Sequence, residues 1–375
     1  MEKNKEIKRT ILLNPGPATT TDSVKHALVV SDICHREKDF TSIVDSVRKD
    51  LTRIATKSPQ DYASVLFTSS GTGAVEATIS SVVPPNKKIL IVNNGAYGQR
   101  MIDIAKVHSI GFVEDRYDWT CAPNLNRLER IVTDTKDLEC IGLVHHETTS
   151  GLLNPMEEVG AIAKRHNLTY IVDAMSSFAG RVFDAKENNI DFLISSSNKC
   201  IQGIAGISFV ICNREELERI REYPPRTVYF DVYAHYKKLE SSGETPFTPA
   251  VQTIYALRTA IDEFFDEGAI GRQERYSRNW HTLVKGMDDI GFRRLHLDGK
   301  NSNILTSFVE PDVKEYNFDK MHDLLYQKGF TIYPGKVGDA RTFRIANLGA
   351  INYQDIERFI GAMKQTLDEM EVDLH

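Results

Sequence analysis

Ser70, Gly71 and Thr72 lie in a run of small polar residues, 69–73, that follows an apolar segment and precedes a helical pattern. Free backbone N–H groups and the helix dipole make such a junction a natural anion site, and the two hydroxyls add donors. The spacing matches neither the P-loop nor the dinucleotide fingerprint. Because the same residue types also cap helices without any ligand, this run alone leaves a phosphate site and a plain helix cap both open.

Asp173 and Lys199 each follow a buried-strand pattern. Asp173 comes directly after residues 170–172, at the carboxyl edge where open α/β sheets bind ligands. Lys199 comes after the next apolar run, in a polar, glycine-containing turn, where an amine held in a cleft can attack a carbonyl group. Taken singly, the acid is equally well a helix cap and the lysine a solvated loop charge.

The three features together narrow the interpretation. A phosphate anchor, an acid for a pyridine nitrogen and a lysine for an aldehyde are the parts that hold pyridoxal phosphate. The combination therefore predicts a pyridoxal 5'-phosphate site, with its residues at the ends of neighbouring strands.

The elements that must position these residues form repeated strand–helix units, which predict an α/β fold with a mainly parallel sheet covered on both faces. Apolar runs predict strands at residues 64–67, 88–92, 140–144, 169–172, 191–195 and 207–211, and helical spacing predicts helices at 73–82, 97–110 and 155–166. The pattern breaks at 214–249, and one long helical stretch follows at 253–291. We assign residues 15–260 to a large domain, and residues 1–14 and 261–375 to a small α+β domain.

Composition excludes several classes of protein. The 46 Lys and Arg against 52 Asp and Glu give a net charge of -6, the opposite of a nucleic-acid binder. No run approaches the roughly 18 apolar residues of a membrane span, so we expect no membrane contact and a cytoplasmic location. The five cysteines show no CxxC pairing and indicate neither disulfides nor a zinc site, and no other metal site is predicted.

Four short motifs carry a resemblance to a known family. They are Leu-Asn-Pro-Gly-Pro at 13–17, Asn-Gly-Ala-Tyr-Gly-Gln-Arg at 94–100, Glu-Thr-Thr-Ser-Gly at 147–151 and Phe-Arg-Ile at 343–345. With the lysine and aspartate segments, they resemble the fold-type I, class V aminotransferases nearly from end to end. The resemblance implies a seven-stranded-type sheet flanked by helices, a small C-terminal domain, pyridoxal phosphate and amino-group transfer.

The resemblance also implies roles around the cofactor. Lys199 would be the catalytic residue that binds the cofactor covalently and moves the proton, and Asp173 would keep the ring nitrogen protonated. Tyr97 would stack on the ring and Thr148 would bind its phenolic oxygen, while residues 70–72 would bind the phosphate.

Three further residues extend this site. In the family a threonine of a second chain completes the phosphate site, and Thr248 occupies its place, which implies a homodimer with shared active sites. Arg344, after a strand of the small domain, would bind the substrate anion, because a guanidinium forks onto a carboxylate or a phosphonate. Gly16 would lie beside the substrate.

Residues 172–178, 197–203 and 333–336 resemble those of family members that move the amino group of 2-aminoethylphosphonate to pyruvate. The implied products are phosphonoacetaldehyde and L-alanine, formed by a ping-pong mechanism. The alternatives are an alanine–glyoxylate or serine–pyruvate aminotransferase, a pyridoxal-phosphate lyase, and a non-catalytic protein with this fold.

Overall fold

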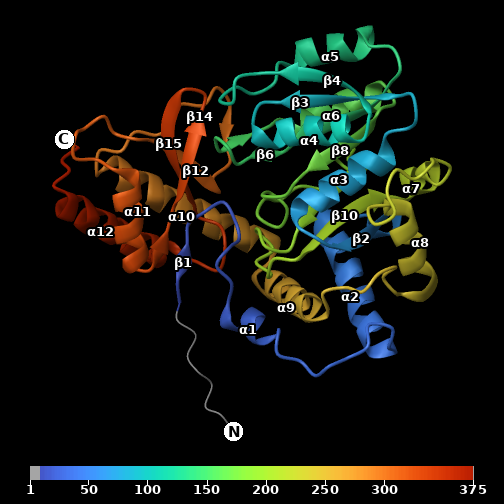
Figure 1. The fold of residues 1–375 in the computed structure, drawn as a ribbon, viewed down its shortest axis with the longest axis horizontal. Coiled ribbons are helices and arrows are strands. Elements are labelled where there is room, and N and C mark those ends of the chain that lie inside the picture. Colours follow the sequence, from blue (N-terminus) through green and yellow to red (C-terminus); the bar gives the residue numbers. More distant parts are fainter. Residues whose placement is uncertain (1–8, 375) are drawn as a thin grey trace.

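The computed structural model describes residues 9–374, and its centre is a seven-stranded sheet (Figure 1). Strand β10 is antiparallel to both of its neighbours, and every other neighbouring pair is parallel. The predicted α/β fold with a mainly parallel, seven-stranded sheet is therefore confirmed. In spatial order the strands are β2 (Tyr62–Thr68), β10 (Ile207–Asn213), β9 (Phe192–Ser196), β8 (Thr169–Asp173), β5 (Leu138–Val144), β3 (Lys88–Asn93) and β4 (Gly111–Arg116).

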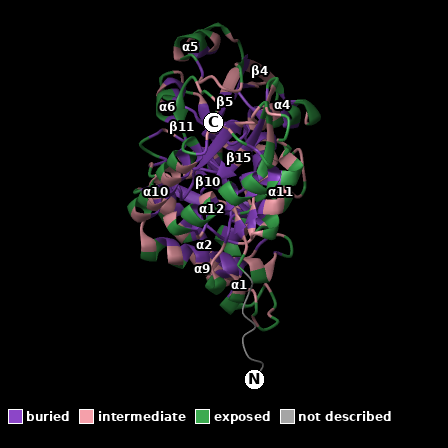
Figure 2. Ribbon diagram, turned by 90° about the vertical axis from the view of Figure 1, so that its left-hand side faces the viewer, coloured by how far each residue is buried: buried purple, intermediate pink, exposed green. Residues whose placement is uncertain are grey.

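Helices flank this sheet, and their apolar sides close its core. All residues of β8 and β9 are buried, as expected for strands that are covered on both faces. In Figure 2 the buried residues gather inside the molecule and the exposed ones follow the outer sides of the helices. The helices of this part are α1 (Asp22–His26), α2 (Lys38–Ala55), α3 (Gly71–Val82), α4 (Ala96–Val107), α5 (Leu125–Asp134), α6 (Met156–Arg165), α7 (Arg214–Ile220), α8 (Val232–Ser242) and α9 (Val251–Glu267), with the short 3₁₀ turn η1 (Pro59–Asp61). Among residues 9–374, no helix combines the length and the apolar character that crossing a membrane requires.

A second group of elements surrounds an antiparallel three-stranded sheet of order β12-β15-β14. Its strands are β12 (Leu305–Val309), β14 (Tyr333–Val337) and β15 (Ala340–Ala346), and its helices are α10 (Ala269–Asp288), α11 (Phe318–Gln327) and α12 (Tyr353–Met370). A further small sheet joins β6 (His146–Glu147) and β7 (Leu152–Leu153) of the large part to β11 (Lys300–Asn301).

The beginning of the described chain packs with its C-terminal third. Strand β1 (Ile11–Leu12) pairs in parallel with β13 (Phe330–Thr331). Ile11 and Leu13 share a buried apolar cluster with α10, α11 and α12, which is separate from the cluster around the large sheet. These two clusters support the division into residues 15–260 and residues 1–14 with 261–375, which stays a prediction.

Two predicted segments differ from the structure. The helical stretch predicted at 253–291 is two helices, because Gly268 adopts a positive φ and ends α9 before α10 begins. The region 214–249, where we predicted a break in the pattern, contains α7 and α8. Both helices are short, and their N-caps, Asn213 and Asp231, accept backbone hydrogen bonds that compensate for their length.

Candidate active site

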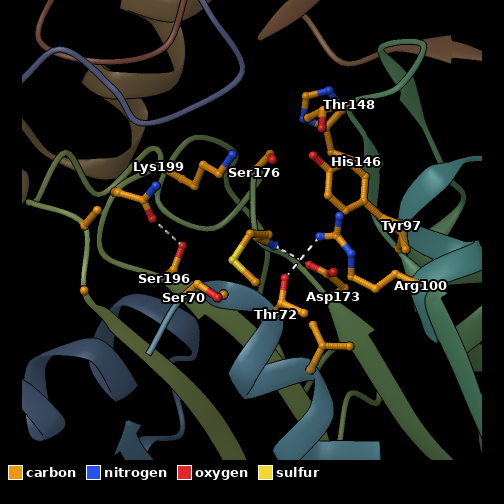
Figure 3. A pocket seen from close by; sticks show the side chains of 17 residues that line it. Ser70, Thr72, Tyr97, Arg100, His146, Thr148, Asp173, Ser176, Ser196 and Lys199 are labelled. Carbon is orange, nitrogen blue, oxygen red and sulfur yellow. Dashed lines mark hydrogen bonds between the residues drawn. The ribbon is translucent and has the colours of Figure 1, made fainter. Parts of the chain in front are cut away.

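Most of the predicted site residues line one cavity of about 400 Å³ at the carboxyl ends of the central strands (Figure 3). They come from five separate places in the sequence, and the parallel strands bring them to one edge. The predicted residues in this wall are Ser70, Gly71, Thr72, Tyr97, Thr148, Asp173 and Lys199.

The N-terminus of α3 forms one end of the cavity. Ser70 is the N-cap of this helix, but its hydroxyl makes no capping hydrogen bond, and the first turn carries no acidic residue. Gly71 lies against the side chain of Met175, so a Cβ at this position would overlap with it. This end therefore offers free N–H groups and a hydroxyl to an anion, with no negative charge in the first turn of the helix to oppose it.

Arg100 adds a positive charge at the same end, and the sequence analysis did not single it out. Its Nη1 donates to Thr72 Oγ1 at 3.1 Å, and its guanidinium carbon lies 4.8 Å from the ring centroid of Tyr97. The signal was present, because Arg100 follows Tyr97 by three residues and so shares its face of α4.

Tyr97 is held in the cavity wall through the first turn of α4. The buried carboxylate of Glu147 accepts hydrogen bonds from the backbone N–H groups of Tyr97 (3.2 Å) and Gly98 (3.4 Å) and from the hydroxyl of Thr149 (2.5 Å). Thr149 Oγ1 in turn accepts from Ala96 N at 3.1 Å. Burial raises the pKa of Glu147 to about 7, although the hydrogen bonds that the carboxylate accepts lower it by favouring the charged form.

Asp173 ends β8 with its side chain in the cavity and accepts a hydrogen bond from Met175 N at 2.8 Å. Burial raises the pKa of Asp173 to about 6, while the bond from Met175 and the charges of Lys199 and Arg100 favour ionisation. At pH 7 the carboxylate form predominates. A charged acid at this place can hold a protonated ring nitrogen.

Lys199 lies in the turn after β9, and its Nζ donates to the carbonyl of Pro15. Burial lowers the pKa of Lys199 to about 8, which favours the free amine relative to an exposed lysine. Gly16 lies directly against this side chain, because a Cβ at Gly16 would approach Lys199 Cδ and Cε to 2.8 Å. The backbone of Gly16 also has a positive φ, which disfavours any other residue.

Arg344 lies in the middle of β15, and the prediction that it follows a strand is wrong. The ladder of β15 with β12 and β14 runs past Arg344, which pairs with Ser307 on one side and Tyr333 on the other. Its guanidinium donates to the carbonyls of Thr148 and Pro334, both at 3.0 Å, and lies 4.9 Å from the ring centroid of Tyr333. Arg344 is not among the residues that line the cavity, but its bond to the Thr148 carbonyl holds the guanidinium beside a residue that does.

Thr248 is exposed and is not among the residues that line the cavity. A single chain therefore does not bring Thr248 to the other predicted phosphate ligands. The segment is fixed elsewhere, since the ring of neighbouring Phe247 stacks on Tyr229 with centroids 5.1 Å apart.

The wall also contains residues that the sequence analysis missed. Ser176, Ser196 and Asn198 belong to the turns that carry Asp173 and Lys199, and the Ser196 hydroxyl donates to Asn198 Oδ1 at 2.8 Å. His146 is the second member of a His-His pair, and only the three-dimensional structure shows that this histidine faces the cavity.

The cavity fits pyridoxal phosphate on the chemistry of its donors. The N-terminus of α3 suits a phosphate, the Asp173 carboxylate suits a pyridine nitrogen, and the Lys199 amine suits an aldehyde. Tyr97 supplies an aromatic face beside them.

Comparisons with known proteins agree with this geometry. The family model described as aminotransferase class-V matches residues 21–340. The chain is 40% identical to the 2-aminoethylphosphonate–pyruvate transaminase of Phocaeicola vulgatus over 357 residues, which cover 94% of this chain and 98% of the relative. It is 41% identical to the protein of the same name from Vibrio cholerae over 360 residues, 95% of this chain and 97% of that one. Among solved structures, the alanine–glyoxylate aminotransferase of Nostoc sp. matches this chain with a TM-score of 0.89 at 24% identity. The match covers 98% of this chain and 97% of the Nostoc chain, and it shows that the two share a fold.

Proposed function

Because the chain belongs to the class V aminotransferase family, we propose that it transfers the amino group of 2-aminoethylphosphonate to pyruvate, which yields phosphonoacetaldehyde and L-alanine. The observation that carries this proposal is the convergence of the α3 N-terminus, Asp173 and Lys199 on one cavity. The guanidinium of Arg344 lies next to this cavity, bonded to the carbonyl of Thr148. The named transaminases that are 40% and 41% identical over almost the whole chain support the choice of substrates. An alanine–glyoxylate specificity is not favoured, since the structure with that name is only 24% identical.

The enzyme is a pyridoxal-phosphate-dependent aminotransferase. When bound, the cofactor supplies an electron sink for the carbanion beside the nitrogen and carries the amino group between the two substrates. We assign its phosphate to Ser70, Gly71 and Thr72, and its phenolic oxygen to Thr148.

The residues of the chain then have distinct tasks. The Nζ of Lys199, with a pKa lowered by burial, first provides the free amine for covalent binding and afterwards takes and returns the proton of the substrate carbon. The Asp173 carboxylate keeps the ring nitrogen protonated. Arg344 binds the phosphonate of one substrate and the carboxylate of the other, because both anions fit the same fork.

A substrate panel tests this assignment. With pyruvate as acceptor and alanine formation as the readout, we expect 2-aminoethylphosphonate to exceed taurine, β-alanine and serine by at least about tenfold in kcat/KM, which corresponds to about 1.4 kcal/mol. Taurine and β-alanine are matched controls, since they present a sulfonate or a carboxylate at the same distance from the amine. A higher kcat/KM with serine, or with alanine and glyoxylate as the substrate pair, would refute the proposed substrates.

We further propose a homodimer in which Thr248 of each chain completes the phosphate site of the other. Two apolar side chains near this threonine, Val228 and Phe247, are solvent-exposed in the single chain. Such an exposed apolar surface supports a partner at this place. The two lie close together, because Phe247 stacks on Tyr229, the residue after Val228.

We expect mass measurement in solution to show a dimer. In Thr248→Ala we expect about tenfold weaker retention of pyridoxal phosphate, because one hydrogen bond to a charged group is lost. Retention is measured by dialysis and absorbance. Ser241→Ala, on the exposed side of α8, is the matched control and should retain the cofactor like the unchanged protein. A fully active monomer would contradict the shared site.

We also propose a cytoplasmic location. All five cysteines are free thiols in the structure, and three of them are buried. Free thiols fit a reducing compartment.

A further inference from the structure

Two adjacent histidines, His145 and His146, follow strand β5, and only His146 lines the cavity. His145 points away from the cavity, where its Nδ1 lies 2.9 Å from the hydroxyl of Ser177 and its ring makes an edge contact with Phe183, with centroids 5.6 Å apart. His146 is only 3% exposed and lines the cavity, yet neither of its ring nitrogens has a hydrogen-bond partner among the described residues. One imidazole is therefore satisfied within the protein and the other is not.

Leaving both nitrogens of a buried imidazole without a hydrogen-bond partner is energetically costly. Burial lowers the pKa of His146 to about 3. The Ser176 carbonyl lies near the ring and opposes this shift, but its contact with the ring does not have the geometry of a hydrogen bond. The ring is thus neutral, with one N–H donor and one acceptor nitrogen. Such a group at a cavity wall is satisfied when a polar atom of a bound molecule reaches it.

The position of His146 indicates which polar atom of a bound molecule its ring can reach. His146 lies two residues before Thr148, and both side chains line the same cavity, whereas Glu147 between them is not among the lining residues. In Figure 3 the imidazole lies with Thr148 across the cavity from Ser70 and Thr72. Because Thr148 is assigned to the phenolic oxygen of pyridoxal phosphate, His146 on the same wall would be in a position to reach the same oxygen.

We propose that His146 donates a hydrogen bond to the phenolic oxygen of pyridoxal phosphate, beside Thr148, and so adjusts the acidity of the cofactor linked to Lys199. The inference rests on the proposed function, in which Lys199 holds the cofactor covalently. The phenolic oxygen shares a proton with the nitrogen that Lys199 contributes. A donor to this oxygen draws charge from it and weakens its attraction for the proton, which is then lost at a lower pH.

The test is a pH titration of the visible absorption band of the full-length protein loaded with pyridoxal phosphate. His146→Leu removes the hydrogen bond at similar size, and we expect the transition to move upward by about one pH unit, since one unit equals about 1.36 kcal/mol of differential interaction. His146→Gln keeps an amide donor and should lie between the two. Asp173, Arg100 and Tyr97 also face the cofactor, but they are the same in every variant, so a difference between variants reports on His146.

His145→Asn is the matched control, because it removes an equally buried imidazole that points away from the cavity. We expect it to lower thermal stability without moving the transition. If His146→Leu does not fold, His146→Ala decides by the same titration. The assignment of His146 would be overturned if the transition pH of His146→Leu stayed the same or fell, or if His145→Asn shifted it equally. The proposed function itself would be overturned if the protein without any substitution showed no visible band.

Discussion

Lys199→Ala is expected to lower turnover by a factor of about 10²–10⁴ or more. A positioned general base contributes this range, and the loss of the covalent link to the cofactor lowers turnover further. No other amine lines the cavity among the described residues, so nothing replaces Nζ as the group that moves the proton. Each half-reaction can be followed through the absorbance of the cofactor. The variant should still bind pyridoxal phosphate through the α3 N-terminus and Asp173, although without the band of the lysine-linked form.

The matched control is Lys364→Ala, on the exposed side of α12, which should behave like the unchanged protein. Retention of the cofactor after dialysis separates a lost reaction from a lost site. Substantial amino transfer by Lys199→Ala would remove this lysine from its assigned role.

Arg344→Lys is expected to reduce kcat/KM by roughly ten- to a hundredfold with 2-aminoethylphosphonate and with pyruvate alike, at about 1.4 kcal/mol per factor of ten. Lysine carries the charge but cannot reproduce the fork, and it loses the two contacts to the carbonyls of Thr148 and Pro334 that aim the guanidinium. The phosphonate is the only anion of 2-aminoethylphosphonate, so both half-reactions should depend on the same residue. They are measured separately, from the pyridoxal form with the amine and from the pyridoxamine form with pyruvate.

Arg341→Lys, at an exposed position of the same strand, is the matched control, because it makes the same replacement away from the cavity. A loss confined to the pyruvate half-reaction would mean that other groups bind the phosphonate. The loop around Gly16, which lies against Lys199, is then the first place to examine.

The strand-end residues were predictable because their chemistry follows directly from local pattern. A buried apolar run that ends in Asp173, and another that leads to the turn of Lys199, fix both residues at the same edge of a parallel sheet. The helix N-terminus at residues 70–72 was also predictable from the run of small polar residues, but its use as an anion site was indicated only by the combination with Asp173 and Lys199. These signals lie within a few residues of the groups that they place.

The contacts that orient the site were not predictable in this way. Glu147 binds the first turn of α4 although it lies 50 residues away from Tyr97 in the sequence. Whether His146 faces the cavity depends on which side of the two-residue strand β6 turns inward. Neither spacing nor composition encodes such pairings. Arg100 differs from these, because its helical spacing from Tyr97 carried a usable signal.

The pairing of β1 with β13 has a consequence for how the protein is made. Ile11 is among the first described residues to leave the ribosome, and its partner Phe330 lies in the last part of the chain to be translated. At about 5–20 residues per second, the partner strand arrives roughly 15–60 seconds afterwards. The carbonyl of Pro15, which receives the Nζ of Lys199, follows closely after β1. The central sheet can form before β13 is translated, but the segment that carries the Pro15 carbonyl is held in its place beside Lys199 only after β13 has joined β1.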